Sequence, residues 1–213
     1  AWDAAEAVLA VKSVLVDLND AAATLPNSYN SVENITPLET PLSSTINGAA
    51  LATPVFLSLY AENDLRLDKY FAETDEKGFR KNKKAGSNNY LCTFRVGEIY
   101  LTAAEAAARL GELSQARTRL LELMRKRYAP EAYEAKSVVV NAMDKEALVQ
   151  EILDERAREL AFEGHRWFDL RRSTRPRLEK VLDGTRYVLE ENDARYTLAI
   201  PKEAIEANPG LLN

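Results

Sequence analysis

The chain of 213 residues carries 28 Lys and Arg against 33 Asp and Glu, a formal net charge of -5, and 46% of its residues are hydrophobic. This composition suits one globular domain with one sizeable core. A mildly acidic surface does not favour a grip on nucleic-acid phosphates, so DNA and RNA are not expected partners. The single Cys92 cannot form an internal disulfide and is expected to be a small buried side chain. The single His165 cannot build a histidine-rich site, so no metal or cofactor is expected.

The N-terminal quarter combines one predicted helix with a long polar segment. Residues 3–24 place apolar side chains at steps of three and four and open with Asp3 and Glu6 in capping-box spacing, which predicts a helix with one buried face. Residues 25–53 are rich in Pro, Asn, Ser and Thr and sustain neither a helical nor a strand period. We therefore expect a long loop, and loops of this length inside a compact domain tend to be functional.

Short elements are expected next. The alternation in PVFLSLY, residues 54–60, predicts a short strand, and residues 62–71 indicate a turn followed by a brief helix. The charged run at 73–89 is typical of a solvated loop.

A helical hairpin is the clearest prediction in the middle of the chain. Residues 96–110 carry apolar side chains on one face and are followed by Gly111, a residue type that ends helices in the left-handed conformation. Ser114 is then placed to cap a second helix that runs to about Tyr128. The bulky and small residues of both helices follow a tetratricopeptide spacing, in which small side chains let two helix backbones approach closely.

The C-terminal third is predicted to be mostly helical. Asp144 is placed to cap a long helix that runs to Gly164. Further elements are a helical segment that starts at Arg166 and ends near Thr174 and Pro176, strands at 185–189 and 195–200, and a last turn of helix that starts at Pro201 and Glu203. The predicted fold class is mainly α, with tetratricopeptide-like helical hairpins, short strands and long loops, in a single domain over residues 1–213.

The stretch ILDERARELAFEGHRWFDLRR, residues 152–172, contains the candidate chemistry. Glu155, Glu159 and Glu163 recur every four residues and therefore share one helix face, as paired-carboxylate catalysis in a glycoside hydrolase would need. Neighbouring arginines are expected to compensate them, since Glu155 faces Arg158 at a spacing of three and Asp154 faces it at a spacing of four. Further counter-charges within reach are Arg156, Arg166, Arg171 and Arg172. Compensated carboxylates stay ionised and are poor general acids, so structural ion pairing is the favoured interpretation.

Other chemistries find less support in this stretch. A di-metal carboxylate site needs two Glu-x-x-His copies, and a serine hydrolase needs a GxSxG turn; the sequence contains neither. No catalytic residue is therefore expected. Gly164 is able to turn the chain left-handed, which would send Trp167 and Phe168 back against the preceding helix as an anchor.

This stretch resembles the ER-xx-EL-x-FEG-x-RWFDLRR signature of the SusD/RagB family, the nutrient-binding lipoproteins of the Bacteroidetes outer membrane. Three further segments resemble motifs of that family in the same order: DLRLDKYF at 64–71, RVGEIYLTAAEAAARLG at 95–111 and YTLAIPKEAIEANPGL at 196–211. The resemblance implies structural roles for the signature residues Glu155, Arg156, Glu159, Glu163, Gly164, Arg166, Trp167, Phe168, Asp169, Arg171 and Arg172.

The resemblance also implies a function. Family members are not enzymes; they bind a glycan or peptide on the outer face of the outer membrane and cap a SusC-like TonB-dependent transporter. They are more than twice as long as this chain and begin with a lipid-bearing cysteine. The chain is therefore expected to be either the C-terminal portion of such a protein or a short relative, without its own lipid anchor.

Ligand-binding residues are expected in the loop at 25–53, because family members that bind sugars use variable loops. Tyr29 is the candidate for stacking on a sugar ring, with the amides of Asn27 and Asn30 beside it for hydroxyl groups. The alternative role for Tyr29 is to pin the loop to the helices. Two rival functions stay open: a helical-repeat interaction module without glycan affinity, and, less favoured, a glycoside hydrolase.

Overall fold

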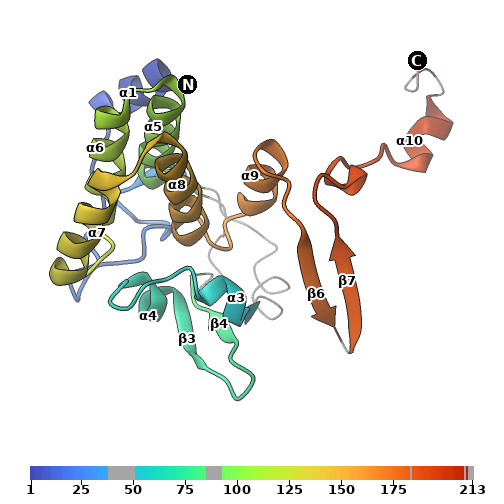
Figure 1. Ribbon diagram of the computed structural model, residues 1–213, viewed down its shortest axis with the longest axis horizontal. Helices are drawn as coiled ribbons and strands as arrows, with labels where there is room; N and C mark the ends of the chain where they lie inside the picture. The colour runs from blue at the N-terminus through green and yellow to red at the C-terminus, as the bar shows by residue number, and fades with distance from the viewer. Residues whose placement is uncertain (38–50, 85–92, 183, 209, 211–213) are drawn as a thin grey trace. The chain divides into compact units, whose positions relative to one another are not determined.

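The computed structural model describes residues 1–37, 51–84, 93–182, 184–208 and 210 (Figure 1). Its contacts divide the chain into two compact units, Ala1–Arg166 and Trp167–Asn213. The single domain expected over 1–213 stays a prediction. Cys92 lies outside the described residues.

A bundle of helices forms the larger core of the first unit. α5 is its central element and packs against α1, α6 and α8, with α6 also touching α7. Small side chains, Ala103, Ala104, Ala107 and Ala116, are fully buried in this core and let α5 and α6 approach closely, as the tetratricopeptide spacing predicted. The mainly α class is therefore confirmed. The helix bounds are α1 Trp2–Val11, α5 Val96–Leu110, α6 Leu113–Met124, α7 Pro130–Ala142 and α8 Lys145–Glu159.

The ends of these helices follow local rules with one exception. Gly111 ends α5 in the left-handed conformation, with φ 91°, as predicted. Asp144 caps α8, where its Oδ1 accepts a hydrogen bond of 2.9 Å from the Ala147 amide. The predicted cap at Ser114 is wrong, because α6 already begins at Leu113 and its cap position is Glu112.

Three predicted helices are shorter than expected. α6 ends at Met124 rather than near Tyr128. α1 ends at Val11, and the rest of 3–24 is not helical because backbone amides there bond elsewhere: Leu18 donates to the Lys126 carbonyl. α8 ends at Glu159 rather than Gly164. The intervening turn has positive φ at Gly164, 86°, which confirms the left-handed prediction for that glycine.

Short helices and strands fill the sequence between α1 and α5. The strand predicted at 54–60 is wrong: Thr53 accepts a hydrogen bond from the Phe56 amide and caps the helix α3, Pro54–Leu57. The brief helix expected within 62–71 is present as α4, Arg66–Tyr70. β2 Leu51–Ala52, β4 Arg80–Asn82 and β3 Phe71–Thr74 form an antiparallel sheet in that order.

The two predicted loops therefore contain regular structure. Within 25–53, turns lead into β1, Asn34–Pro37, which pairs antiparallel with β5, Thr93–Arg95, while 38–50 lie outside the described residues. Within 73–89, β4 and its turn replace the expected loop, and 85–89 are not described.

A second, aromatic core lies beside this small sheet. The rings of Phe56, Tyr60, Phe71 and Phe162 meet edge to face, with centroids 5.5 to 6.4 Å apart. These contacts bind α3 and β3 to the turn that follows α8.

The second unit, which begins at Trp167, contains a β-hairpin and all of α9 except its first residue. α9, Arg166–Arg172, confirms the predicted helical segment but ends before the expected end near Thr174. Phe168 is 64% exposed, so the anchor prediction is not borne out for this residue. Trp167 stacks on Tyr196 with a centroid distance of 5.2 Å, and its contact with the preceding helix stays a prediction. The strand predicted at 195–200 is wrong, since a 3-10 turn occupies Ala194–Tyr196. The remaining elements are β6 Leu178–Leu182, antiparallel to β7 Thr185–Leu189, and α10 Lys202–Ala207.

Of the helices formed by the described residues, none combines the length and the apolar character that crossing a membrane requires.

Candidate functional site

Charged side chains from distant segments of the first unit meet in a buried ion network. These side chains are almost wholly inaccessible to solvent. The members of the network are Glu33, Asp64, Arg66, Lys84, Arg95, Arg127, Glu155, Arg158, Glu159 and Glu163.

Glu159 is the centre of the ion network. Its carboxylate accepts hydrogen bonds from Nε and Nη2 of Arg127 at 2.9 Å each, from Nη1 of Arg95 at 2.6 Å and from Nη1 of Arg66 at 3.2 Å. Burial opposes ionisation of this carboxyl group, but the three guanidinium groups outweigh it and hold the pKa of Glu159 well below its usual value.

The two flanking glutamates are compensated in the same way. Glu155 accepts from Arg66 at 2.6 Å and from Nε of Arg158 at 2.8 Å, and Glu163 accepts from Nη2 of Arg95 at 2.8 Å. Burial raises the pKa of each carboxyl group, yet the adjacent arginines lower both pKa values overall. The predicted shared face and the Glu155–Arg158 pair are therefore confirmed.

The principal counter-charges were not predicted from the sequence. Arg66, Arg95 and Arg127 were not assigned as partners, although Arg66 and Arg95 lie in the segments 64–71 and 95–111 that carry family motifs. Gly97, the second residue of α5, was not predicted to have a role either. A Cβ there would lie 2.5 Å from Nη1 of Arg95, so only glycine leaves room for the ion network.

Lys84, just after β4, is the lysine of the ion network. Its ammonium group donates to the Glu159 carbonyl at 2.9 Å and to the Glu163 carboxylate, and it lies 4.4 Å from the ring centroid of Tyr70. Burial lowers the pKa of Lys84 to about 8, and the nearby Glu163 carboxylate opposes this shift without cancelling it.

The ion network also fixes the start of the predicted ligand loop. Glu33 accepts hydrogen bonds from Arg127 at 2.6 Å and from Arg95 at 3.0 Å. The Asn27 amide donates to the Lys84 carbonyl at 3.0 Å, and the residue is only 1% exposed. Asn27 therefore holds the loop in place and is not accessible to a ligand, contrary to the role expected for it.

Tyr29 and Asn30 occupy the surface of this fixed turn. The side chain of Asn34 donates to the carbonyls of Ser28 and Tyr29 at 2.6 and 2.7 Å, which sets the shape of the turn. Tyr29 is 47% exposed and Asn30 is exposed. Their contact with a ligand stays a prediction.

The remaining signature residues lie around the ion network or in the second unit. Arg156 pairs with Glu98 at 3.6 Å, and Asp169 pairs with Arg172 at 2.6 Å. Arg166 is exposed and Arg171 is half-buried. Among the described residues, no group of three or more His, Cys, Asp or Glu side chains could hold a metal ion.

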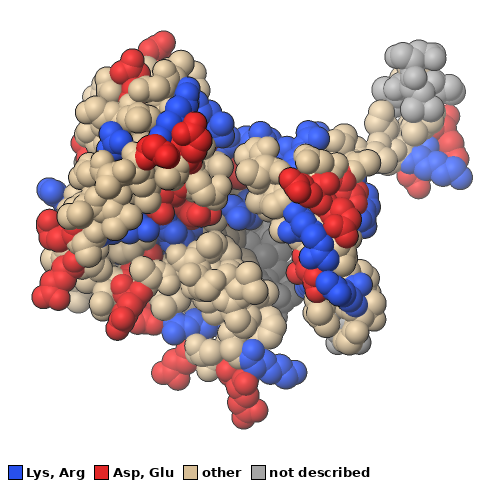
Figure 2. Space-filling view, in the orientation of Figure 1, with Lys and Arg blue, Asp and Glu red and all other residues tan. Residues whose placement is uncertain are grey.

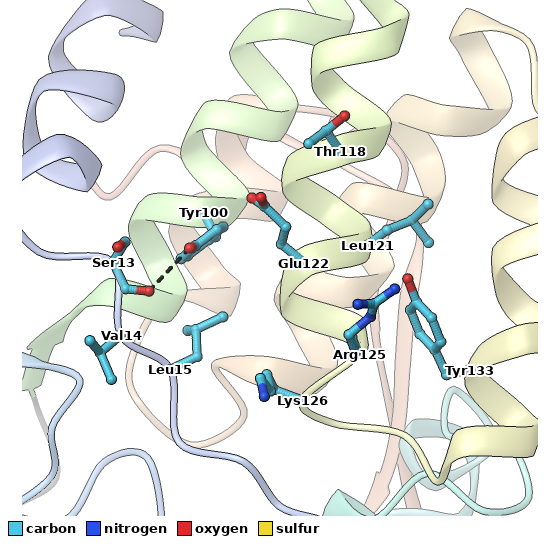
Figure 3. A pocket seen from close by; sticks show the side chains of 10 residues that line it. All are labelled: Ser13, Val14, Leu15, Tyr100, Thr118, Leu121, Glu122, Arg125, Lys126 and Tyr133. Carbon is cyan, nitrogen blue, oxygen red and sulfur yellow. Dashed lines mark hydrogen bonds between the residues drawn. The ribbon is translucent and has the colours of Figure 1, made fainter.

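A groove of about 630 Å³ lies over α6 in the first unit, and sequence reasoning did not anticipate it. Figure 3 shows Glu122 of α6 and the two residues just after this helix, Arg125 and Lys126. They lie between Tyr100 on one side and Tyr133 on the other. Both tyrosines are about nine-tenths buried, and the Tyr100 hydroxyl donates a hydrogen bond of 3.1 Å to the Ser13 carbonyl. Its lining residues are Ser13, Val14, Leu15, Tyr100, Thr118, Leu121, Glu122, Arg125, Lys126 and Tyr133.

Comparison with known proteins identifies the relatives of this chain. The model of the SusD family matches residues 51–213. A solved structure of a SusD-like carbohydrate binding protein from Bacteroides vulgatus ATCC 8482 is similar, with a TM-score of 0.66 and 18% sequence identity over 96% of this chain and 53% of that chain. This chain thus spans about half the length of that protein. No curated protein matches the sequence.

Proposed function

Because this chain belongs to the SusD family, we propose that it binds a carbohydrate without altering it. In this proposal it is part of a nutrient-binding protein on the outer face of the outer membrane, which delivers its ligand to a SusC-like TonB-dependent transporter. The observation that carries the proposal is the family match, which spans most of the chain and includes the helix that bears Glu155, Glu159 and Glu163.

The state of these three glutamates supports a role without catalysis. A glycoside hydrolase needs one carboxyl group that is protonated near neutral pH and another carboxylate across a cleft from it. Glu155, Glu159 and Glu163 instead are buried against arginines, which lower their pKa values. They hold the fold together and are not available as proton donors.

The turn that carries Tyr29 and Asn30 provides a place for the ligand. A half-exposed tyrosine ring beside an exposed amide is suited to the apolar face and the hydroxyl groups of a sugar. The ion pairs of Glu33 and the buried amide of Asn27 hold the turn before any ligand arrives. A turn ordered in advance loses less conformational entropy on binding, which favours affinity.

The test is native affinity electrophoresis of the chain in gels that contain plant, host-mucin or storage polysaccharides. We expect one class of polysaccharide to retard the protein, and we expect Tyr29→Ala and Asn30→Ala to reduce the retardation. Tyr187→Ala is the matched control, because Tyr187 is an exposed tyrosine on the hairpin of the second unit. Absence of retardation by every polysaccharide contradicts the proposal. Retardation that Tyr29→Ala leaves unchanged keeps the function but moves the site.

A protein-interaction module without glycan affinity is the second candidate, favoured by the tetratricopeptide-like pair α5 and α6. It predicts no retardation by any polysaccharide, together with a stable complex between this chain and a SusC-like transporter in size-exclusion chromatography. Retardation by a polysaccharide would rule it out.

A further inference from the structure

The groove over α6 combines apolar surface with groups that form hydrogen bonds. Leu15 and Leu121 are half-buried and line it with aliphatic carbon. Hydroxyl groups of Ser13 and Thr118 belong to the same lining, and the Ser13 carbonyl accepts a hydrogen bond of 3.1 Å from the Tyr100 hydroxyl. This alternation matches a sugar, in which one face of the ring presents C–H groups and the rim presents hydroxyl groups.

Two of the three charged residues that line the groove, Arg125 and Lys126, are basic. Arg125 is exposed and forms no ion pair with any residue of the described part of the chain. Lys126 is paired with the half-exposed Asp17 at 2.8 Å. The single acidic lining residue, Glu122, shares Arg119 with Glu6, at 2.8 and 2.5 Å. Figure 2 shows acidic and basic side chains mixed over the surface of these helices.

Arg125 is held in position without a carboxylate partner. Its guanidinium carbon lies 5.1 Å from the ring centroid of Tyr133, and Figure 3 shows the two side chains next to each other. A cation–π contact of this kind orders the side chain and leaves its N–H donors available. A guanidinium group in that state presents a planar pair of donors that fits a carboxylate.

We propose that this groove binds an acidic oligosaccharide, with the carboxylate of a uronic acid on Arg125 and Lys126 and the ring against Leu15 and Leu121. The proposal rests on the proposed carbohydrate-binding function and adds a ligand class and a second site to it. The carbonyl groups at the end of α6 repel an anion, so the carboxylate depends on both cations.

The experiment compares two ligands of the same sugar backbone, one with charged carboxylates and one with neutral methyl esters. Oligogalacturonate and its fully methyl-esterified form are titrated calorimetrically into the intact chain at low and at high salt. We expect the acid to bind and the ester to bind about tenfold more weakly, because a hydrogen bond to a charged group is worth roughly that factor. Raising the salt concentration should lower the affinity for the acid towards that for the ester, because salt screens the solvent-exposed cations of the groove.

Two variants assign the effect to the groove. Arg125→Gln should reduce the affinity for the acid about tenfold and leave the ester unchanged. Lys81→Gln, which removes the same charge from the exposed β4 position outside the groove, should change neither. Equal losses in both variants would show that net charge alone attracts the acid and would overturn the proposal.

The outcomes separate this site from the proposed function. Binding of neutral polysaccharides that Tyr29→Ala abolishes, without any binding of oligogalacturonate, leaves the proposed function intact and rejects the groove. Equal affinity for acid and ester, or preference for an acidic peptide such as oligoglutamate over the oligogalacturonate, also rejects it. Failure to bind any saccharide rejects both.

Discussion

Replacing Glu159 by Gln removes the central charge of the ion network while the side chain keeps nearly the same size. The carboxylate receives donors from Arg66, Arg95 and Arg127, and an amide oxygen cannot balance three guanidinium charges. Removal of one partner from a buried ion pair costs about 3–5 kcal/mol, against a total stability of about 5–15 kcal/mol for a typical domain. With a urea slope of about 2 kcal/mol per molar, the midpoint of unfolding should fall by about 1.5–2.5 M.

Urea titrations followed by circular dichroism measure this loss. Glu134→Gln is the matched control, since Glu134 is exposed on α7 and the same change there should stay within about 0.5 kcal/mol. A loss below about 1 kcal/mol for Glu159→Gln would refute the reasoning, because charge balance would then contribute little. The folded-state pKa of Glu159 is lowered, so its contribution is present above the unfolded pKa and is lost as the pH falls through the folded pKa. The difference between wild type and variant should therefore shrink in acid.

Three further changes test separate parts of the account. Gly97→Ala should destabilise the fold by about 1–3 kcal/mol in urea despite the higher helix propensity of alanine, because its Cβ would meet Nη1 of Arg95; a gain in stability contradicts this. The free energy of unfolding of the wild type should rise relative to that of Lys84→Met between about pH 8 and about pH 10. In this range the unfolded lysine still binds a proton that folded Lys84, with a pKa of about 8, has released. Parallel curves of unfolding free energy against pH would rule this out. Asp144→Ala should cost about 1 kcal/mol in thermal unfolding, and an unchanged midpoint would show that the cap contributes nothing.

Elements whose determinants are local were predicted well. The apolar face of α5 and the glycine at 111 define that helix without reference to the rest of the chain, and Asp144 does the same for the start of α8. The family prediction is confirmed as well, because its motifs are read directly from the sequence.

Elements that depend on tertiary contacts were not predicted. The helical period continues past Val11, but the backbone of Val16 and Leu18 bonds to Glu33 and to the Lys126 carbonyl instead. These bonds join segments that are remote in sequence, so the periodicity of residues 3–24 could not reveal them.

The ion network shows the same limit. The four-residue spacing of Glu155, Glu159 and Glu163 places them on one face, but Arg66 and Arg95 approach Glu159 from 93 and 64 residues away. Composition near the glutamates therefore suggested the wrong principal counter-charges. Their identity depends on how the folded chain brings Arg66 of α4 and Arg95 of β5 to Glu159 of α8.

The exposure of the candidate binding residues was predicted for one of them and not for another. A polar loop predicts exposure, which holds for Tyr29 but fails for Asn27, because the carbonyl of Lys84 offers the amide a buried partner. The groove is assembled from residues 13–15 and three helices, and such a convergence has no signature in the sequence.

The central claim is that this chain binds a carbohydrate without altering it. Its most direct test is a calorimetric titration of the intact chain with oligosaccharides prepared from the polysaccharide that retards it, followed by sizing of the recovered oligosaccharides. The account predicts saturable binding and oligosaccharides of unchanged length. Shortened oligosaccharides, or the absence of saturable binding, would contradict it.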